Sequence, residues 1–290
     1  MATTTTCDPR IRWLVWDDDG LPPRPLDTLR AAGTHDGMLE QLGAQMDRFV
    51  PLLERYGCEI AIDRFLAAAP SWEERLDAQA TLNTLARLSG LPARHFGAGW
   101  APPYPHLRYR VLRDLELGLV RLVARADNDV EVLVGALETG AASGELPLLD
   151  AAAVRASATT GVELALPGGG LAEFARTNPV PAWAADAMAR GAATAQQRGR
   201  PLGYANNATD RNRIQSAQLM KLGPMWAAAG LRDDPTVAHE SIRHTAAHHV
   251  HQRAGIEAAA RFLGTTNLDR VSIKVGARPW PPRRVRRTNR

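Results

Sequence analysis

Ser241-Ile242-Arg243-His244-Thr245 is the stretch on which the interpretation of this chain depends, and Phe262-Leu263-Gly264-Thr265-Thr266-Asn267-Leu268-Asp269 follows it about twenty residues later. Helical patterning predicts one helix over 239–253 and another over 256–263. An Arg-His-Thr box on a helix arises by chance in many proteins. Its meaning therefore comes from the order of the other landmarks along the chain.

Length and composition place the chain among globular proteins. Its 290 residues suffice for two domains, or for one large and one smaller domain, and 45% of them are hydrophobic. It has no run of eighteen apolar residues and no basic start leading into an apolar stretch, so we expect neither a membrane span nor a secretory signal. Two cysteines, Cys7 and Cys58, form no disulfide framework, and we expect a cytoplasmic protein.

The positive charge consists almost entirely of arginine. The formal net charge is +4, and the only lysines are Lys221 and Lys274. A GC-rich genome accounts for most of this bias, although arginine also makes bidentate contacts to phosphates and guanines. Six arginines gather near the end of the chain: Arg278, Arg283, Arg284, Arg286, Arg287 and Arg290. Such a tail is either an electrostatic handle for nucleic acid or a solvated terminus.

Helical patterning and a Gly/Pro-rich interruption divide the chain. Apolar residues at three- and four-residue steps predict a helical bundle over 37–95, and Ser71 and Glu74 form a capping box within it. The Gly/Pro-rich segment 97–105 is the predicted linker. Further elements are expected over 107–126, 128–138, 183–197 and 211–229 as helices, and over 164–170 as a strand running into a turn. The resulting parts are an N-terminal segment (1–36), a helical domain with its linker (37–105), a second domain (106–275) and a basic tail (276–290).

The second domain resembles the catalytic domain of the tyrosine recombinases, the phage integrase family. The landmarks occur in the family's order: a Thr-Gly turn with Glu-Leu at 139–146, a hairpin-like stretch at 161–170, a proline-rich approach at 180–184, a helix at 214–222, Gly230-Leu231, and the box at 241–245. The resemblance implies a mainly α fold with a small β-hairpin or sheet. The helical bundle before it would be a core-binding-like domain, and the two together would form a C-shaped clamp around duplex DNA.

The same resemblance implies that catalysis has been lost. Family members attack phosphorus with a tyrosine and stabilise the developing charge with arginines. Here Ala142 stands in the place of the first arginine, and Glu240 in that of the histidine before the second arginine. Thr265 replaces the second late histidine, and Lys274 replaces the nucleophile. His239 lies beside Glu240, no lysine precedes Lys221, and no tyrosine follows Tyr204. We therefore expect no strand transfer and no catalytic residue in this chain.

Three other constellations have competing interpretations. His244, His248 and His251 share a helix face and could chelate zinc, but no acidic third ligand stands at a recognisable spacing. The glycines at 168–170 lack the Lys-Ser/Thr of a phosphate loop and fit a hairpin tip better. The aspartates at 17–19 fit an acidic turn better than a cation site.

Two sets of cations have both a structural and a DNA-binding interpretation. Arg243 is either buried in an ion pair with Glu145 or Asp150, or it clamps a DNA phosphate, and the resemblance favours the phosphate. Arg211 and Arg213 open a helix capped by Thr209 or Asp210; they are either a solvated helix start or backbone contacts to DNA. The residues expected to contact DNA are Arg243, His244, Arg211, Arg213, Lys221, Arg278, Arg283, Arg284, Arg286 and Arg287.

We therefore expect a sequence-specific double-stranded DNA-binding protein on a catalytically inactive recombinase-like fold. Transcription regulation is the first expected role, and an accessory part in site-specific recombination or mobile-element maintenance is the second. We expect no cofactor, no metal and no membrane partner, a homo-oligomer on DNA, and a place at the nucleoid in the cytoplasm. The competing classes are a divergent active integrase, a histidine-based metal-dependent hydrolase and a protein-interaction module.

Overall fold

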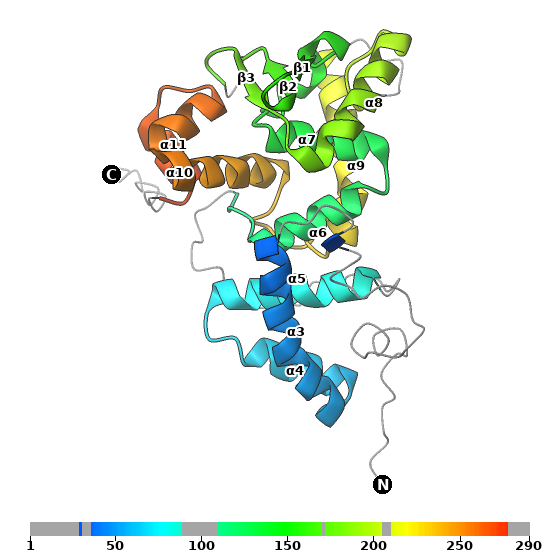
Figure 1. Ribbon diagram of the computed structural model, residues 1–290, viewed down its shortest axis with the longest axis vertical. Coiled ribbons are helices and arrows are strands. Elements are labelled where there is room, and N and C mark those ends of the chain that lie inside the picture. Colours follow the sequence, from blue (N-terminus) through cyan, green and yellow to red (C-terminus); the bar gives the residue numbers. More distant parts are fainter. Residues whose placement is uncertain (1–28, 31–35, 89–108, 170–171, 205–209, 278–290) are drawn as a thin grey trace, which may run out of the picture.

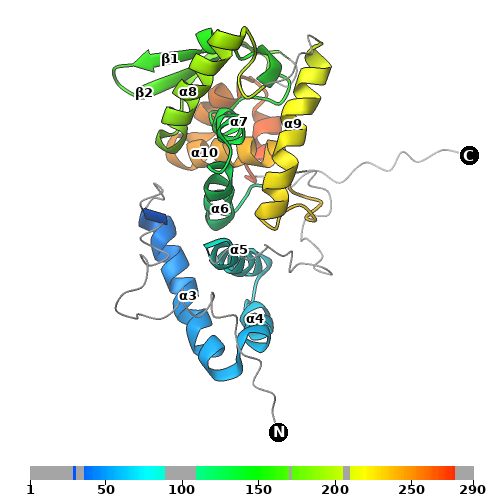
Figure 2. The same ribbon diagram turned by 90° about the vertical axis from the view of Figure 1, so that its right-hand side faces the viewer.

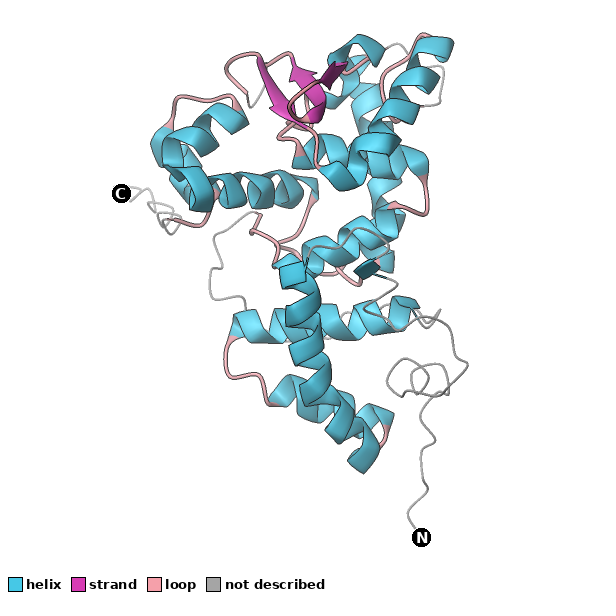
Figure 3. Cartoon of the chain, viewed as in Figure 1, coloured by secondary structure: helices cyan, strands magenta, loops and turns pink. Residues whose placement is uncertain are grey.

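The computed structural model describes residues 29–30, 36–88, 109–169, 172–204 and 210–277. Within them the chain is mainly helical and carries one small sheet (Figure 3), which confirms the predicted fold class. The predicted acidic turn at 17–19, the linker at 97–105 and the tail arginines from Arg278 onward lie outside the described residues. Almost all of the N-terminal segment 1–36 does too.

Three helices make up the described residues 36–88. They are α3 (Asp36–Tyr56), α4 (Cys58–Ala67) and α5 (Trp72–Leu88). The predicted apolar stripe of α3 is buried, and its Phe49 ring lies 5.2 Å from the ring of Phe65 in α4. Burying a side chain of this size contributes roughly 1.5–3 kcal/mol. Ser71 accepts the Glu74 backbone N–H at 3.1 Å, as expected of the first member of a capping box.

Helix α5 is buried without interruption from Leu76 to Leu85. Figure 1 shows the reason: α5 crosses between α3 and α4 on one side and α6 (Asp114–Ala124) on the other. A helix covered on opposite faces has no solvent stripe, so its sequence lacks the one-sided apolar pattern of a surface helix.

The second half is built around α7 (Asn128–Glu138), which is buried from Val130 to Glu138. The surrounding elements are η1 (Leu146–Leu148), η2 (Ala151–Ala153), α8 (Ala182–Arg198), α9 (Arg211–Ala228), α10 (His239–Leu263) and α11 (Leu268–Lys274). Figure 2 shows α7 enclosed by α8, α9 and α10. The predicted helices at 128–138, 183–197 and 211–229 are confirmed within one or two residues, the usual uncertainty of helix ends.

The sheet has three antiparallel strands in the order β1-β2-β3, which confirms the predicted small β-hairpin or sheet. They are β1 (Val154–Ser157), β2 (Gly161–Leu166) and β3 (Arg176–Pro179). Leu164 in the central strand pairs with Val154 on one side and with Asn178 on the other. The outer strands are only four residues long: the alternation of apolar and polar residues in β1 is too brief to mark a strand in sequence, and the mostly polar β3 has none.

Two further differences from the sequence prediction have physical causes. The helix expected from 107 begins at Asp114, because Glu116 accepts the Arg113 backbone N–H at 2.8 Å and caps the helix there. Before it the chain is non-helical: Leu112 donates its N–H to the Thr245 hydroxyl at 2.8 Å. Helix α11 was not predicted, and seven residues are too few for a helical period to stand out.

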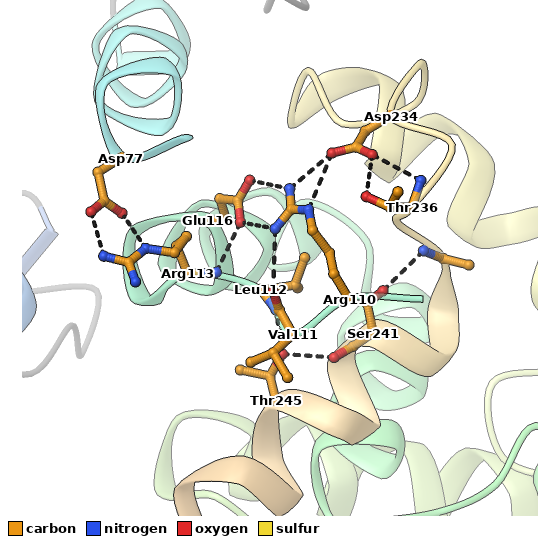
Figure 4. A network of polar contacts seen from close by, with 11 residues as sticks. Asp77, Arg110, Val111, Leu112, Arg113, Glu116, Asp234, Thr236, Ser241 and Thr245 are labelled. Carbon is orange, nitrogen blue, oxygen red and sulfur yellow. Dashed lines mark hydrogen bonds and ion pairs between the residues drawn. The ribbon is translucent and has the colours of Figure 1, made fainter. Parts of the chain in front are cut away.

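A buried network joins this non-helical segment to both halves of the chain (Figure 4). The Arg110 guanidinium lies 2.6 Å from the Glu116 carboxylate and 2.9 Å from that of Asp234. Burial lowers the pKa of Arg110, but the Glu116 and Asp234 carboxylates raise it by more, so the arginine is charged. Arg113 reaches Asp77 of α5 at 2.6 Å. These contacts hold the start of α6 against α5 and against the loop before α10.

Candidate functional site

Arg243 is completely buried, with a relative exposure of 0%. Its Nε donates to the Gly140 carbonyl at 2.9 Å, and its Nη2 donates to the Leu263 carbonyl at 2.8 Å. In a straight helix, residues 243 and 263 would lie about 30 Å apart, because each residue rises 1.5 Å. Helix α10 therefore doubles back at Gly255, whose φ of 82° and ψ of 175° are not helical. Arg243 connects the two arms of this bent helix.

Glu240, one turn before Arg243, neutralises its charge. The Arg243 Nη1 atom lies 3.5 Å from Glu240 Oε2, and neither atom has a hydrogen-bond partner among the described residues. Burial raises the pKa of Glu240, but Arg243, the neighbouring histidines and the Ser143 N–H together lower it by more, so the carboxylate is ionised at neutral pH. Burial also lowers the pKa of Arg243, yet a guanidinium starts so high that it stays protonated. The two charges form an enclosed pair.

His244 is buried beside the same carboxylate, with Nε2 lying 3.9 Å from Glu240 Oε2. Burial lowers the pKa of His244 to about 3, although Glu240 opposes the shift. The imidazole is therefore neutral at pH 7. In this structure Arg243 and His244 do not line a groove, contrary to the sequence prediction, because burial separates both from the surface. The ion-pair partner of Arg243 is Glu240. The sequence had suggested Glu145 or Asp150 as the partner of a buried Arg243.

A second arginine at this site, Arg176 on β3, was missed in the sequence; its side chain is 5% exposed. It contacts both carboxylate oxygens of Glu145, at 2.8 and 2.9 Å, and also donates to the carbonyls of Gly140 and Phe262 at 2.6 and 2.9 Å. The Phe262 and Leu263 carbonyls end α10, where helix carbonyls lack intrahelical partners and favour cations. Arg176 and Arg243 thus satisfy this helix end together. No motif in the sequence pairs them.

Carboxylates surround the turn at 139–145, where the resemblance implies a first arginine. Ala142 is buried there, and its N–H donates to Glu145 Oε2 at 2.8 Å. The next N–H, that of Ser143, donates to Glu240 Oε1 at 3.3 Å. A phosphate at this turn would meet two carboxylates at the backbone donors that it needs, so like charges oppose its binding.

Lys274, at the end of α11, adjoins this cluster. Burial lowers the pKa of Lys274 to about 8, and the charge of Arg243 lowers it in the same direction. The amine makes no hydrogen bond or ion pair with any residue that the structure describes. The position that the resemblance assigns to the nucleophile therefore holds a partly buried amine beside the Arg243 cluster.

The three histidines considered as zinc ligands, His244, His248 and His251, do not converge. His248 Nδ1 lies 2.7 Å from the Val275 carbonyl and its Nε2 lies 2.7 Å from the Gln252 amide, whereas His251 Nδ1 is buried without a hydrogen-bond partner. Across the described ranges, no group of three histidine, cysteine, aspartate or glutamate side chains is arranged to hold a metal ion.

The predicted cations of α9 differ from one another. Arg211 and Arg213 are exposed in the first turn of α9. They follow the N-cap residue Asp210, whose carboxylate accepts the Arg213 N–H at 2.9 Å. Arg211 donates to the Gly144 carbonyl at 2.6 Å, which places it at the rim of the 139–145 turn. Lys221 is paired with Asp129 at the start of α7, so its charge is neutralised by the protein.

The remaining predicted DNA contacts, Arg278, Arg283, Arg284, Arg286 and Arg287, lie outside the described residues, as does Thr209. Among the residues that the structure does describe, no helix combines the length and apolar character needed to cross a bilayer.

No protein-family model matches the chain, and no curated protein matches its sequence. Among solved structures, that of XerA recombinase is similar with a TM-score of 0.47 and 16% identity, over 87% of this chain and 91% of that chain. XerH site-specific recombinase, in a post-cleavage complex with palindromic difH substrate, gives 0.48 and 12% over 94% of both chains. A lambda integrase dimer bound to a COC′ core site gives 0.43 and 14%, over 90% of this chain and 78% of that chain.

Proposed function

We propose that this chain is a double-stranded DNA-binding protein of tyrosine-recombinase-like architecture that does not break DNA. The observation that carries the proposal is the enclosed pair of Glu240 and Arg243. Where the resemblance implies a phosphate, the arginine already has a carboxylate partner at 3.5 Å. The first arginine of such a site is replaced by Ala142.

The electrostatics of this site oppose phosphoryl transfer. The reaction needs positive charge on the non-bridging oxygens as negative charge develops there, and losing one such donor costs an enzyme roughly 10²–10³ in rate. Arg243 is compensated, His244 is neutral at pH 7, and no tyrosine follows Tyr204. An attacking hydroxyl and its charge stabilisation are lost together.

DNA affinity would come from exposed arginines at the start of α9, outside the carboxylates of the turn at 139–145. Arg211 and Arg213 lie in the first turn of α9, where the helix N-terminus also favours an anionic phosphate. Contacts of this kind supply affinity and register, while contacts to base edges would supply sequence preference. A specific clamp without cleavage suits a transcription regulator, acting as a homo-oligomer on DNA at the nucleoid. An accessory part in recombination is the second candidate, because it uses the same binding.

The first test is selection of fragmented genomic DNA by the purified full-length chain at roughly physiological salt, where non-specific binding is weak. A few enriched sites that share a motif would support specific binding, and the genes beside them would identify the regulated pathway. Uniform or negligible recovery would overturn the proposal of a sequence-specific binder.

The second test addresses cleavage. The selected site, nicked so that a cleaved strand cannot be religated, is incubated with the chain and resolved on a denaturing gel. We expect no covalent protein–DNA adduct, while an active tyrosine recombinase on its own nicked site serves as the positive control. An adduct would show that the chain retains a nucleophile and would favour the competing interpretation, a divergent active integrase.

A further inference from the structure

A cavity of about 300 Å³ lies where the two halves of the chain meet. Its walls come from α5, the segment at 109–114, α10 and α11, and they include Trp72, Tyr109, Leu112, His248 and Lys274. Trp72 is held in place by the Arg110 guanidinium, which stacks over its ring at 5.3 Å. The cavity therefore combines aromatic and apolar walls with one primary amine, and charged or polar side chains also line it: Glu73, Arg110, Arg113, Asp114 and His249.

The amine of Lys274 stands apart from the other polar groups that the structure describes. It forms no hydrogen bond or ion pair within the described part of the chain, yet it is not among the polar atoms that are sealed from solvent. Arg243 and Arg270 add positive charge beside it, Glu240 adds negative charge, and His244 is neutral at pH 7. Because Lys274 lines the cavity, a ligand there meets a lysine that no described side chain engages.

The surroundings also change the protonation of this amine. Burial, followed by the charge of Arg243, lowers the pKa of Lys274 to about 8. At pH 7.5 about a quarter of such an amine is uncharged, against about 0.1% of an ordinary lysine. Only the uncharged form carries a lone pair for attack on carbon. The other lysine, Lys221, is paired with Asp129 and serves as an internal comparison.

We propose that Lys274 is a nucleophilic amine that forms an imine with an aldehyde bound in this cavity. The Nζ lone pair attacks the carbonyl carbon and gives a carbinolamine. The carbonyl oxygen then leaves as water with the two amine protons, and a C=N bond remains. No oxidant or reductant is needed. The aldehyde comes either from a small metabolite or from the opened deoxyribose of an abasic site, and the second source rests on the proposed DNA binding.

The test uses the full-length chain, acetaldehyde and cyanoborohydride at pH 7.5, with each modified amine located by peptide mass spectrometry. We expect Lys274 to be alkylated at least tenfold faster than Lys221, with a rate that reaches half its maximum near pH 8. Lys274→Arg keeps the charge and should abolish only the Lys274 signal, while Lys221→Arg should leave it unchanged. Equal labelling of the two lysines, or slower labelling of Lys274, would overturn the inference.

The source of the aldehyde is tested with duplex DNA carrying one abasic site and with borohydride as the trapping reductant. A covalent complex that forms with this duplex, and neither with the intact duplex nor with Lys274→Arg, assigns the aldehyde to DNA. Acetaldehyde labelling without such a complex assigns it to a small molecule. Because the acetaldehyde reaction needs no DNA, it can succeed even if the proposed DNA binding fails, so the two failures are distinguishable.

Discussion

Glu240 and Arg243 form an ion pair 3.5 Å across inside α10, and the same arginine bonds the carbonyls of Gly140 and Leu263. One side chain thus connects the two arms of a bent helix to the turn at 139–145. An arginine with three protein partners and no exposed surface organises the fold. Arg243 therefore has a structural role that does not depend on DNA, and mutations can test that role through protein stability.

Glu240→Gln should destabilise the protein by about 3–5 kcal/mol, because it leaves the Arg243 charge buried without a partner. The measurement is the free energy of unfolding in urea. The double variant Glu240→Gln/Arg243→Met removes both charges and should recover part of that loss. A loss below about 1 kcal/mol in the single variant would contradict the pair's role, since that is the range of an exposed ion pair.

Gly255→Ala should destabilise the protein by about 1–3 kcal/mol, because a φ of 82° strains a residue with a Cβ. The added methyl group meets no atom within 4 Å, so only backbone strain is tested. Gly223→Ala, inside α9, is the matched control; it also meets nothing within 4 Å and should stabilise by up to about 1 kcal/mol. Thermal or urea unfolding compares them. Equal effects would show that α10 does not need its bend at Gly255.

Arg211→Ala/Arg213→Ala should weaken binding to the selected DNA site and lower the slope of log K against log salt by about 1.8, because each phosphate contact contributes about 0.9. Fluorescence anisotropy over a salt series gives both values. Arg155→Ala, which removes an exposed arginine on β1, should change neither. An unchanged slope in the double variant would exclude α9 from the DNA interface.

His244 should make the protein less stable in acid. Its folded-state pKa of about 3 is depressed from the ordinary 6.5, so its contribution is complete above pH 6.5 and is lost as pH falls towards 3. One proton gives a slope of about 1.4 kcal/mol per pH unit in that window. His239, whose pKa burial also lowers, adds in the same direction. Urea unfolding between pH 4 and 7 measures the slope, and His244→Gln should reduce it.

An NMR titration provides the direct check. The His244 imidazole resonances should not shift between pH 5 and 8, whereas those of an exposed histidine titrate near its ordinary pKa. A midpoint above pH 6 for His244 would contradict its burial beside Glu240.

Local chemistry made much of the fold predictable. Ser71 and Glu74 mark a helix start by capping, and the apolar steps of α3 mark its buried face, because both signals act within a few residues. Helix α11 and strand β1 escaped prediction for the opposite reason: each is too short to show a period. The start of α6 depends on the Glu116 cap and on a bond from Leu112 to Thr245, a partner far along the chain.

The sequence alone shows which residues occupy the site: Ala142, Glu240 and Lys274 hold their positions independently of the fold. The sequence does not show the partner of Arg243, because the pairing of a buried charge depends on the distance between the groups and on the exclusion of water. Those follow from the bend at Gly255 and from the hydrogen bond of Arg176 to the same Gly140 carbonyl. Residue types set which chemistry was available to the chain, and long-range packing set which charges could meet.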